Sequence, residues 1–269
     1  MNPMQAILRA PPLALSVLAL SLAGCSSTPK DDASTGSAEK LYAEAKDEAL
    51  AGNYEKAAKL HERVEGRAAG TLLAQQAQLD RAWALYKSGD KPGALAAVER
   101  FIKLNPSSPG LDYALYLQGL INFNDNLGLM STLANQDLSE RDQQASRDAY
   151  RSFRQLVEQF PQSSYAPDAQ LRMNYIINSL AAYEVHVARY YYRRGAYVAA
   201  ANRAMTSVQE FQQSPSAEEA LYIMSISYDK LGLAELRDDA NRVLLKNYPN
   251  TKFPSNGLGA REHAWWQFW

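Results

Sequence analysis

The sequence predicts an all-α protein, a superhelix of about five helix pairs, and two observations support this. The first is a pattern of turn, helix and stop, which is clearest in Ser88–Pro109, where Gly89 lies in the turn and Pro106 ends the helix. The second is that this pattern recurs. Related versions begin at three further glycines: Gly52, Gly195 and Gly232. A unit that returns at this period is typical of helical repeats, in which each pair buries its apolar face against the next.

Residues 1–24 have the composition of a signal peptide. They contain one charge, Arg9, followed by an apolar run from Ala10 to Leu22 that is too short to span a bilayer comfortably. The boundary Leu22-Ala23-Gly24-Cys25 resembles the bacterial lipobox, which implies that Cys25 is lipidated and becomes the first residue of the mature chain. Cys25 is the only cysteine, so no intramolecular disulfide can form. The alternative is an ordinary signal peptide with a stray cysteine.

Residues 25–37 are predicted to be a lipidated flexible tether. No large apolar side chain lies between Cys25 and Ala38, so this stretch cannot bury a core. By resemblance to sorted bacterial lipoproteins, Ser26 after the cysteine implies delivery to the outer membrane. Without residues 1–24 the chain has 27 basic and 29 acidic residues, a net charge of −2. This balance does not favour binding to nucleic acid or adhesion to anionic lipid.

The N-terminal repeats are predicted in residues 38–123. Two helices broken at Gly52-Asn53 form the first pair, and three more helices follow in Leu72–Lys87, Gly93–Leu104 and Leu111–Phe123. A small residue in one helix matches a small residue in its partner: Ala45 with Ala57, Ala82 with Ala94, and Gly119 in the third pair. Helices joined by so short a turn must cross closely, which only small side chains permit. This arrangement resembles the tetratricopeptide repeat.

An insertion at residues 124–142 interrupts the third pair. The second helix of that pair is predicted in Gln143–Phe160 and ends before Pro161. The insertion is too long for a repeat turn, and it carries four large apolar residues: Leu127, Leu129, Met130 and Leu133. It either contacts a partner or folds over the repeat as a loop.

The C-terminal repeats are predicted in residues 143–250. Residues 167–194 contain no glycine or proline after Pro167, which predicts one helix of 28 residues, about 42 Å long. Its tyrosines are either a ligand platform or ordinary packing: Tyr175, Tyr183, Tyr190, Tyr191 and Tyr192. The remaining helices are predicted in Tyr197–Phe211, Ala217–Leu231 and Ala234–Tyr248. The last pair fits less well, because Arg237 stands where a small residue is expected and Ala240 is the alternative.

Residues 251–269 form an aromatic tail. Three of the four tryptophans lie in its last five residues, Trp265–Trp269. Exposed to water they would form a large apolar surface, so they must be buried somewhere. They either fold back on the last repeat as a cap or dock on a partner or the membrane interface.

The chain has no recognisable catalytic, metal or cofactor motif. None of its histidines is paired with another His or Cys at ligand spacing, which excludes the common zinc patterns: His61, His186 and His263. Gly-x-Ser-x-Gly, Walker and dinucleotide motifs are also absent from the sequence. Three carboxylates near aromatic residues are expected in salt bridges or solvent: Glu158, Glu184 and Glu210. We therefore predict a binding protein that is not an enzyme.

Three motifs together resemble one family. They are Asp137-x-Ser139-x-Arg141-Asp142, Phe153-x-x-Leu156-Val157-x-x-x-Pro161-x-Ser163-x-Tyr165 and Tyr190-Tyr191-x-x-Arg194-Gly195-Ala196-Tyr197. With the lipobox ahead of them, they are similar to the BamD family of lipoproteins, which belong to the outer-membrane β-barrel assembly machinery. The resemblance covers roughly residues 38–249. It implies N-terminal repeats that bind unfolded outer-membrane proteins and C-terminal repeats that dock on the BamA subunit, within a complex that includes other subunits.

The resemblance also suggests site residues. Arg194, Arg203 and Tyr197 are the candidates for the surface that faces BamA, since arginine suits bidentate polar capture. The candidates for the substrate groove rest on position and chemistry alone: Tyr42, Trp83, Tyr86 and Tyr113. Two other functions stay open at this point. One is a pilotin-like assembly factor for a secretin, and the other is the helical part of a murein-cleaving enzyme, although no stretch outside the repeats is long enough for its catalytic domain.

The lipobox generates a prediction about attachment. Cys25→Ser removes the thiol that would carry the acyl chains, so the variant should move from the membrane fraction to the soluble periplasmic fraction. Fractionation of cells that express either chain measures this. If the variant stays in the membrane fraction, something other than lipidation holds the protein there.

Overall fold

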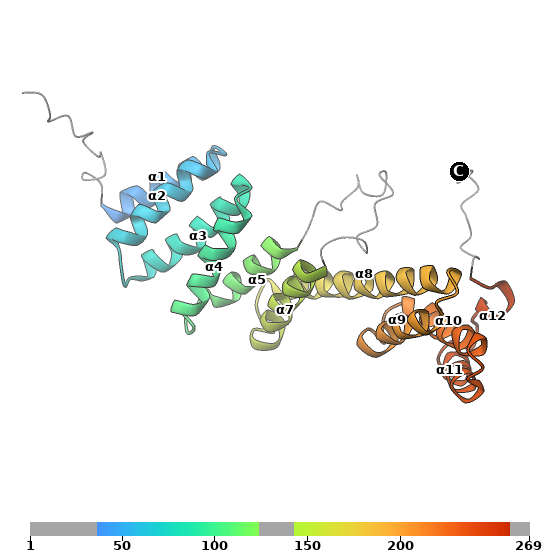
Figure 1. Cartoon of the computed structure of the whole chain (residues 1–269). Helices are drawn as coiled ribbons and strands as arrows, with labels where there is room; N and C mark the ends of the chain where they lie inside the picture. The colour runs from blue at the N-terminus through green and yellow to red at the C-terminus, as the bar shows by residue number, and fades with distance from the viewer. Residues whose placement is uncertain (1–36, 124–142, 259–269) are drawn as a thin grey trace, which may run out of the picture.

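The computed structural model describes residues 37–123 and 143–258 of the chain, and within those two ranges every regular element is a helix. The first five are α1 (Ala38–Leu50), α2 (Tyr54–Arg67), α3 (Leu72–Ser88), α4 (Lys91–Leu104) and α5 (Leu111–Asn122). After residue 142 come α7 (Gln143–Gln159), α8 (Ala166–Arg193), α9 (Tyr197–Glu210), α10 (Ser216–Lys230), α11 (Ala234–Asn247) and the short α12 (Phe253–Asn256). The helices form an elongated array that runs from α1 at one end to α11 at the other (Figure 1).

The fold class predicted from the sequence is confirmed. Each predicted helix is present, with ends within two residues of the expected ones, and the helices pack as five consecutive antiparallel pairs. Four turns between paired helices contain a glycine with positive φ, a conformation that other residues rarely adopt: Gly52, Gly89, Gly195 and Gly232. At Gly89, the backbone N–H also bonds the carbonyls of Leu85 and Tyr86, which closes the end of α3.

The small residues predicted at the helix crossings are buried. Ala45, Ala57, Ala82 and Ala94 have no exposed surface. In the third pair, Gly119 of α5 faces the ring of Phe153 on α7, and a Cβ placed on the glycine would lie 2.4 Å from Cε1 of that ring. Phe153 is itself fully buried, so the ring has no room to move aside.

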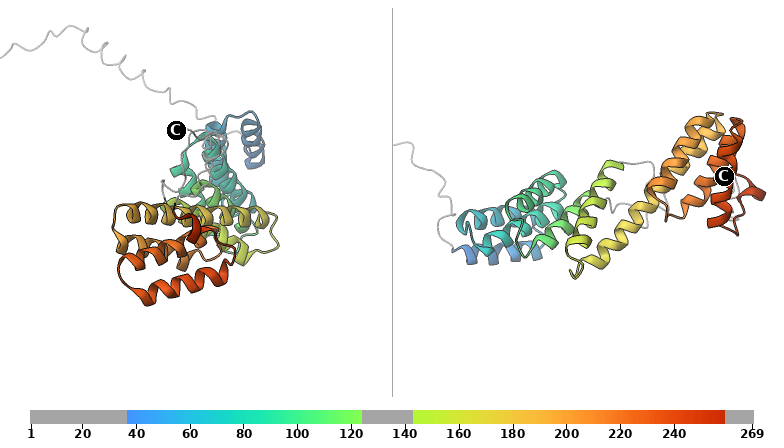
Figure 2. Two further views of the ribbon diagram at one scale, coloured as in Figure 1. Left: turned by 90° about the vertical axis from the view of Figure 1, so that its right-hand side faces the viewer. Right: turned by 90° about the horizontal axis from the view of Figure 1, so that it is seen from below.

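The long helix α8 joins the two ends of the array. It has 28 residues, as predicted, and it belongs to two separate apolar clusters. Met173 and Ile176 in its first part pack with Phe153 of α7, whereas Val185 and Ala188 in its second part pack against α9 and α10. Figure 2 shows it as a continuous rod between the two groups of helices. The orientation of one group relative to the other therefore depends on α8.

The fifth pair resolves the choice between Arg237 and Ala240. Ala240 is buried with Leu244, whereas Arg237 is partly exposed and its Nη1 lies 3.1 Å from Oδ1 of Asp229. After α11 the chain turns back, and Phe253 stacks on Tyr222 of α10. The alternatives for the tail concern its tryptophans, which lie outside the described residues, and they stay open.

Several sequence predictions lie outside the described residues. These are the signal peptide, Cys25 and its tether, the insertion at 124–142, and Trp265–Trp269. Among the described helices, none combines the length and the apolar character that are needed to cross a bilayer.

Gly119→Ala should destabilise the fold, since the new methyl group would overlap the buried Phe153 ring. Overpacking of this kind costs about 1–3 kcal/mol. The matched control is Gly66→Ala in α2, where an added Cβ has nothing within 4 Å, and this change should be neutral or slightly stabilising. Urea unfolding followed by circular dichroism compares the two. Equal midpoints for the two variants would show that the contact is not tight.

Candidate functional site

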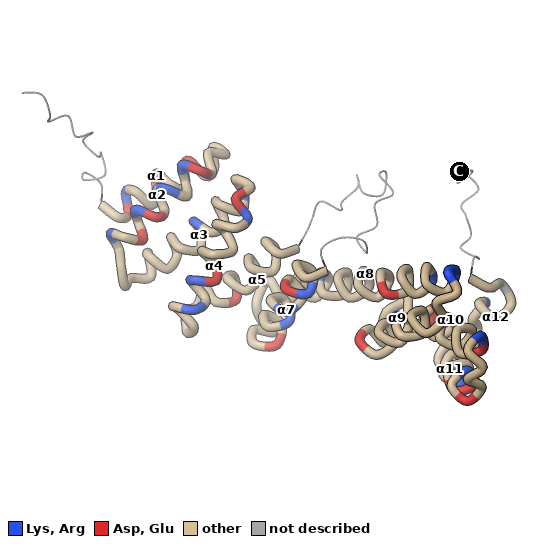
Figure 3. The backbone as a smooth tube through the Cα atoms, in the orientation of Figure 1, with Lys and Arg blue, Asp and Glu red and all other residues tan. Residues whose placement is uncertain are grey.

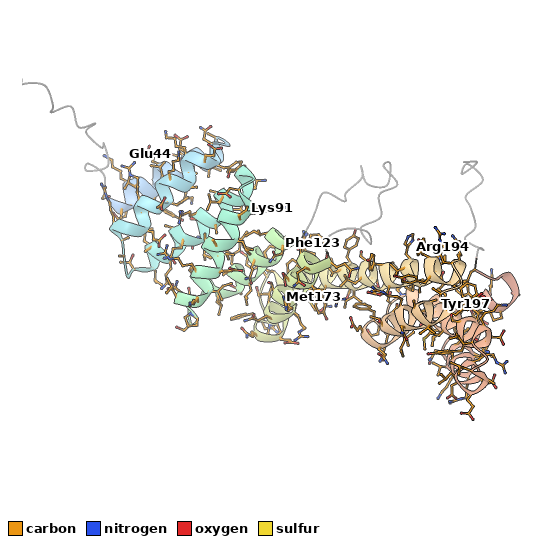
Figure 4. All side chains as sticks on the ribbon, in the orientation of Figure 1. Glu44, Lys91, Phe123, Met173, Arg194 and Tyr197 are labelled. Carbon is orange, nitrogen blue, oxygen red and sulfur yellow. The ribbon has the colours of Figure 1, made fainter. Side chains whose placement is uncertain are left out.

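Two candidate surfaces lie toward opposite ends of the array. Figure 4 shows this separation, with Glu44 of α1 near one end and Arg194 and Tyr197 near the other. The first surface is a groove of about 470 Å³ between α1, α2 and α3. Two of the four residues predicted for the substrate groove, Tyr42 and Trp83, line it. Its other lining residues are Lys46, Ala49, Leu50, Tyr54, His61, Gln76 and Asp80.

A carboxylate that the sequence analysis did not identify organises the floor of this groove. The hydroxyl of Tyr42 donates to Oδ2 of Asp80 at 2.7 Å, and Nε2 of Gln76 donates to Oδ1 at 3.0 Å. Burial, and then the hydrogen bond to Asp80, raise the pKa of Tyr42 well above its ordinary value. The phenol therefore stays protonated and keeps both the ring and the carboxylate in place.

His61 forms the deepest part of the same wall. It is 1% exposed, its ring meets the ring of Tyr42 edge-on at 5.6 Å, and its Nδ1 has no hydrogen-bond partner. Burial lowers the pKa of His61, although the negative charge of Asp80 acts in the opposite direction. The lowered pKa favours the uncharged ring at neutral pH. Its position on the apolar face of α2, four residues after Ala57 and three before Val64, is the signal that could have placed it inside.

The rim of the groove is aromatic and cationic. The rings of Trp83 and Tyr86 lie 5.7 Å apart, and Nζ of Lys87 lies 5.5 Å from the Trp83 ring and 5.7 Å from the Tyr54 ring. Nζ of Lys46 lies 5.9 Å from the ring of Tyr42. Neither lysine forms an ion pair within the described ranges. These groups suit a peptide with aromatic side chains and negative charge.

The aromatic row continues along the first helices of the later pairs. Tyr113, the fourth predicted groove residue, packs in one cluster with Trp83 and Tyr86, and burial raises its pKa above the ordinary value. Its ring lies 5.4 Å from that of Tyr165, which stacks on Tyr116 at 4.9 Å. The four candidates therefore lie on α1, α3 and α5: Tyr42 and Trp83 line the groove, and Trp83 also packs with Tyr86 and Tyr113 in the adjoining cluster.

A second carboxylate ends this row. The hydroxyl of Tyr116 donates to Oδ2 of Asp168 at 2.7 Å, and Nε of Arg172 donates to the same oxygen at 2.6 Å. Burial would raise the pKa of Asp168, but the bonds from Arg172 and Tyr116 outweigh it and hold that pKa below its ordinary value. The guanidinium of Arg172 also lies 5.0 Å from the Phe123 ring, which meets the ring of Tyr175 at 5.9 Å. This connects α5 to α8.

The second candidate surface is the corner between α8 and α9. Arg194 comes directly after the last residue of α8, is exposed, and lies over the ring of Tyr190 at 5.5 Å. Tyr197 begins α9 and meets Tyr192 edge-on at 5.4 Å. Around them, Tyr190 is 53% exposed and Val198 is 59% exposed. The α8 tyrosines at this corner thus pack against neighbouring side chains, and part of their surface stays exposed to solvent.

Arg203 has a different environment from the other two. Its Nη1 donates to Oε2 of Glu184 at 3.1 Å, and Glu184 is only 3% exposed. This hydrogen bond raises the pKa of Arg203 further above its ordinary value. Arg203 therefore neutralises a buried carboxylate and holds α9 against α8, which ties it to the packing of this corner.

The expected ion pairs of the three glutamates are present. Glu184 pairs with Arg203, Glu158 with Arg154 at 3.4 Å, and Glu210 with Arg147 at 3.2 Å. In the part of the chain that the structure describes, no group of three or more His, Cys, Asp or Glu side chains could hold a metal ion. Lys and Arg alternate with Asp and Glu along the array, while the middle of α8 carries few charges (Figure 3). The described part of the chain therefore offers aromatic and charged side-chain surfaces that are suited to binding a partner.

Comparison with known proteins gives a consistent result. Residues 34–244 match the YfiO family, described as outer membrane lipoprotein. The chain is 46% identical over 233 residues to the outer membrane protein assembly factor BamD of Neisseria meningitidis serogroup A, which is 87% of each protein. It is 45% identical to the protein of the same name from Neisseria gonorrhoeae, covering 94% of this chain and 96% of that one, and 32% identical to the one from Haemophilus influenzae, covering 90% and 92%. Among solved structures, MamA aligns over 82% of this chain and 96% of its own, at 13% identity and a TM-score of 0.37.

The Tyr116–Asp168 bond predicts a pH dependence. Burial, with the bond to Asp168, raises the pKa of Tyr116 to about 12, whereas a phenol in the unfolded chain titrates near 10. The contribution of Tyr116 to stability is therefore complete below about pH 10 and is lost as the pH rises towards about 12. Between these values, unfolding of the wild type should release up to one proton more than unfolding of Tyr116→Phe. Urea unfolding of both chains at pH 9, 10, 11 and 11.5 measures this, and equal slopes against pH would contradict it.

Proposed function

The chain belongs to the BamD family of outer membrane protein assembly factors, and from this we propose that it is a non-enzymatic scaffold of the machinery that assembles β-barrels in the outer membrane. The observation that carries the proposal is the presence of two separate candidate surfaces, the aromatic groove on α1–α3 and the corner between α8 and α9. The long helix α8 packs on α7 at one end and on α9 and α10 at the other, so the two surfaces stand apart on one array, which suits a protein that brings two others together.

We propose that the groove binds unfolded outer-membrane proteins through their C-terminal targeting strand. Three features support this. The groove has aromatic walls at Tyr42 and Trp83, unpaired cations at Lys46 and Lys87, and a volume of about 470 Å³ that accommodates side chains of a bound peptide.

We propose that the α8–α9 corner docks on BamA. Arg194 has a guanidinium that is exposed and makes no ion pair among the described residues, so it is available for a bidentate bond to a partner carboxylate. Exposed Tyr190 and Val198 supply apolar area around it, and Tyr197 lies beside them. Arg203 supports the corner by holding Glu184. The lipid on Cys25 would keep the chain at the periplasmic face of the outer membrane, where other subunits of the complex assemble.

The test separates the two surfaces. Trp83→Ala should weaken binding of a labelled C-terminal barrel peptide at least tenfold, because it removes a wall of the groove, and it should leave BamA affinity unchanged. Arg194→Ala should weaken binding to BamA and leave the affinity for the peptide unchanged. Fluorescence anisotropy with the peptide and biolayer interferometry with the periplasmic domains of BamA measure both affinities for both variants.

The control is Lys230→Ala, an exposed residue at the end of α10 that lies in neither surface, and it should change neither affinity. A Trp83→Ala chain that binds the peptide like wild type would contradict the groove assignment. A pull-down of the lipidated protein that recovers a secretin without BamA would contradict the proposed assembly function as a whole.

A further inference from the structure

The segment after α11 does not extend the repeat array but returns to an earlier helix. α12 contacts α10, and Figure 1 shows it beside α10 at the end of the array. The family match ends at residue 244, before this segment begins. The two surfaces of the proposed assembly function do not include the segment.

Two apolar side chains attach the segment. The ring of Phe253 stacks on the ring of Tyr222 at 5.5 Å, with an angle of 23° between the ring planes. Five residues later, Leu258 packs against a buried cluster contributed by three helices: Val185, Ala188, Ala200, Ala204, Ala220 and Ile223. α8 and α10 are in direct contact. The segment thus covers part of the apolar surface that these two helices form together.

The hydrogen bonds of the segment are local, within the segment or to Tyr248 just before it. The N–H of Gly257 bonds the carbonyl of Phe253, the hydroxyl of Ser255 bonds the carbonyl of Lys252, and the N–H of Thr251 bonds the carbonyl of Tyr248. The contacts that join the segment to α8, α9 and α10 are those of the Phe253 and Leu258 side chains. A short terminal segment that docks through two side chains can exchange with a free peptide of the same kind.

The surface beneath the segment is also built to receive a ring. Burial raises the pKa of Tyr222, so its phenol stays uncharged beneath Phe253. Tyr192 packs against the same buried cluster as Leu258 and meets Tyr197 edge-on. Flat uncharged rings offer stacking positions for aromatic side chains.

We propose that the shared face of α8 and α10 is a second peptide-binding site, and that its resident ligand is the chain's own segment Thr251–Leu258. The site takes a peptide that carries an aromatic residue, one helical turn, and an aliphatic residue five positions after the aromatic one. In the resting chain, the tethered copy is present at an effective concentration of about millimolar, so it excludes weaker peptides of the same kind.

The experiment adds a fluorescein-labelled peptide of residues 250–259 to the full mature chain and to its Phe253→Ala/Leu258→Ala variant. The peptide should bind the variant at least tenfold more tightly than the wild type, because the tethered copy no longer occupies the site. Addition of Tyr222→Ala to this variant should abolish the gain, and a peptide with alanine at both positions should not bind. Fluorescence anisotropy measures the affinities, and circular dichroism checks that each chain is folded.

The matched control is Leu236→Ala/Leu245→Ala, which removes two exposed leucines from α11 and should exclude the peptide as the wild type does. If the double variant does not fold, Phe253→Ala alone provides the same comparison. Equal binding to the wild type and the variant, or binding to neither, would overturn the proposal. Binding that persists after Tyr222→Ala would also overturn it, since the peptide would then be held elsewhere.

Discussion

The first three helix pairs of this protein each depend on a buried contact at which at least one residue must be small. In the first two pairs alanines meet, as at Ala82 and Ala94, and in the third a glycine meets the ring of Phe153. Close crossing makes each pair rigid, and a rigid pair presents its outer residues at fixed positions. The groove on α1–α3 lies between helices of the first two pairs, so the packing of these pairs fixes the positions of Tyr42 and Trp83 that line it.

The polar interactions act between successive pairs. Each one fixes the position of one helix relative to the next, where apolar packing alone would allow the helices to slide. Tyr42 binds Asp80 across α1 and α3, and Tyr116 binds Asp168 across α5 and α8. Further along, Nε of Arg189 donates to Glu219 at 2.8 Å and links α8 to α10. Each of these bonds joins the first helices of successive pairs. Buried bonds of this kind add directional specificity that small apolar residues cannot supply.

The sequence predicted the helices well and the groove only partly, for a physical reason. Helix ends are determined by local features, such as the turn at Gly89 and the stop at Pro106, and close crossings need only the small residues visible in each pair. Asp80 and Asp168 were missed because their partners lie 38 and 52 residues away, and no local pattern reveals such a distance. Arg203 was assigned from a motif to a partner surface, whereas its bond to buried Glu184 could be seen only once α9 was placed on α8.

The continuity of α8 has a geometric consequence for the two surfaces that it connects. Between Arg172 and Glu184 the helix has no charged residue, no glycine and no proline, and so it contains none of the usual points of bending. The rotation of the α8–α9 corner relative to the third helix pair therefore depends on the number of residues in α8. Each residue added to an α-helix rotates its far end by about 100° and advances that end by about 1.5 Å. An insertion or deletion of one residue in the middle of α8 would therefore turn the corner to a different side of the array.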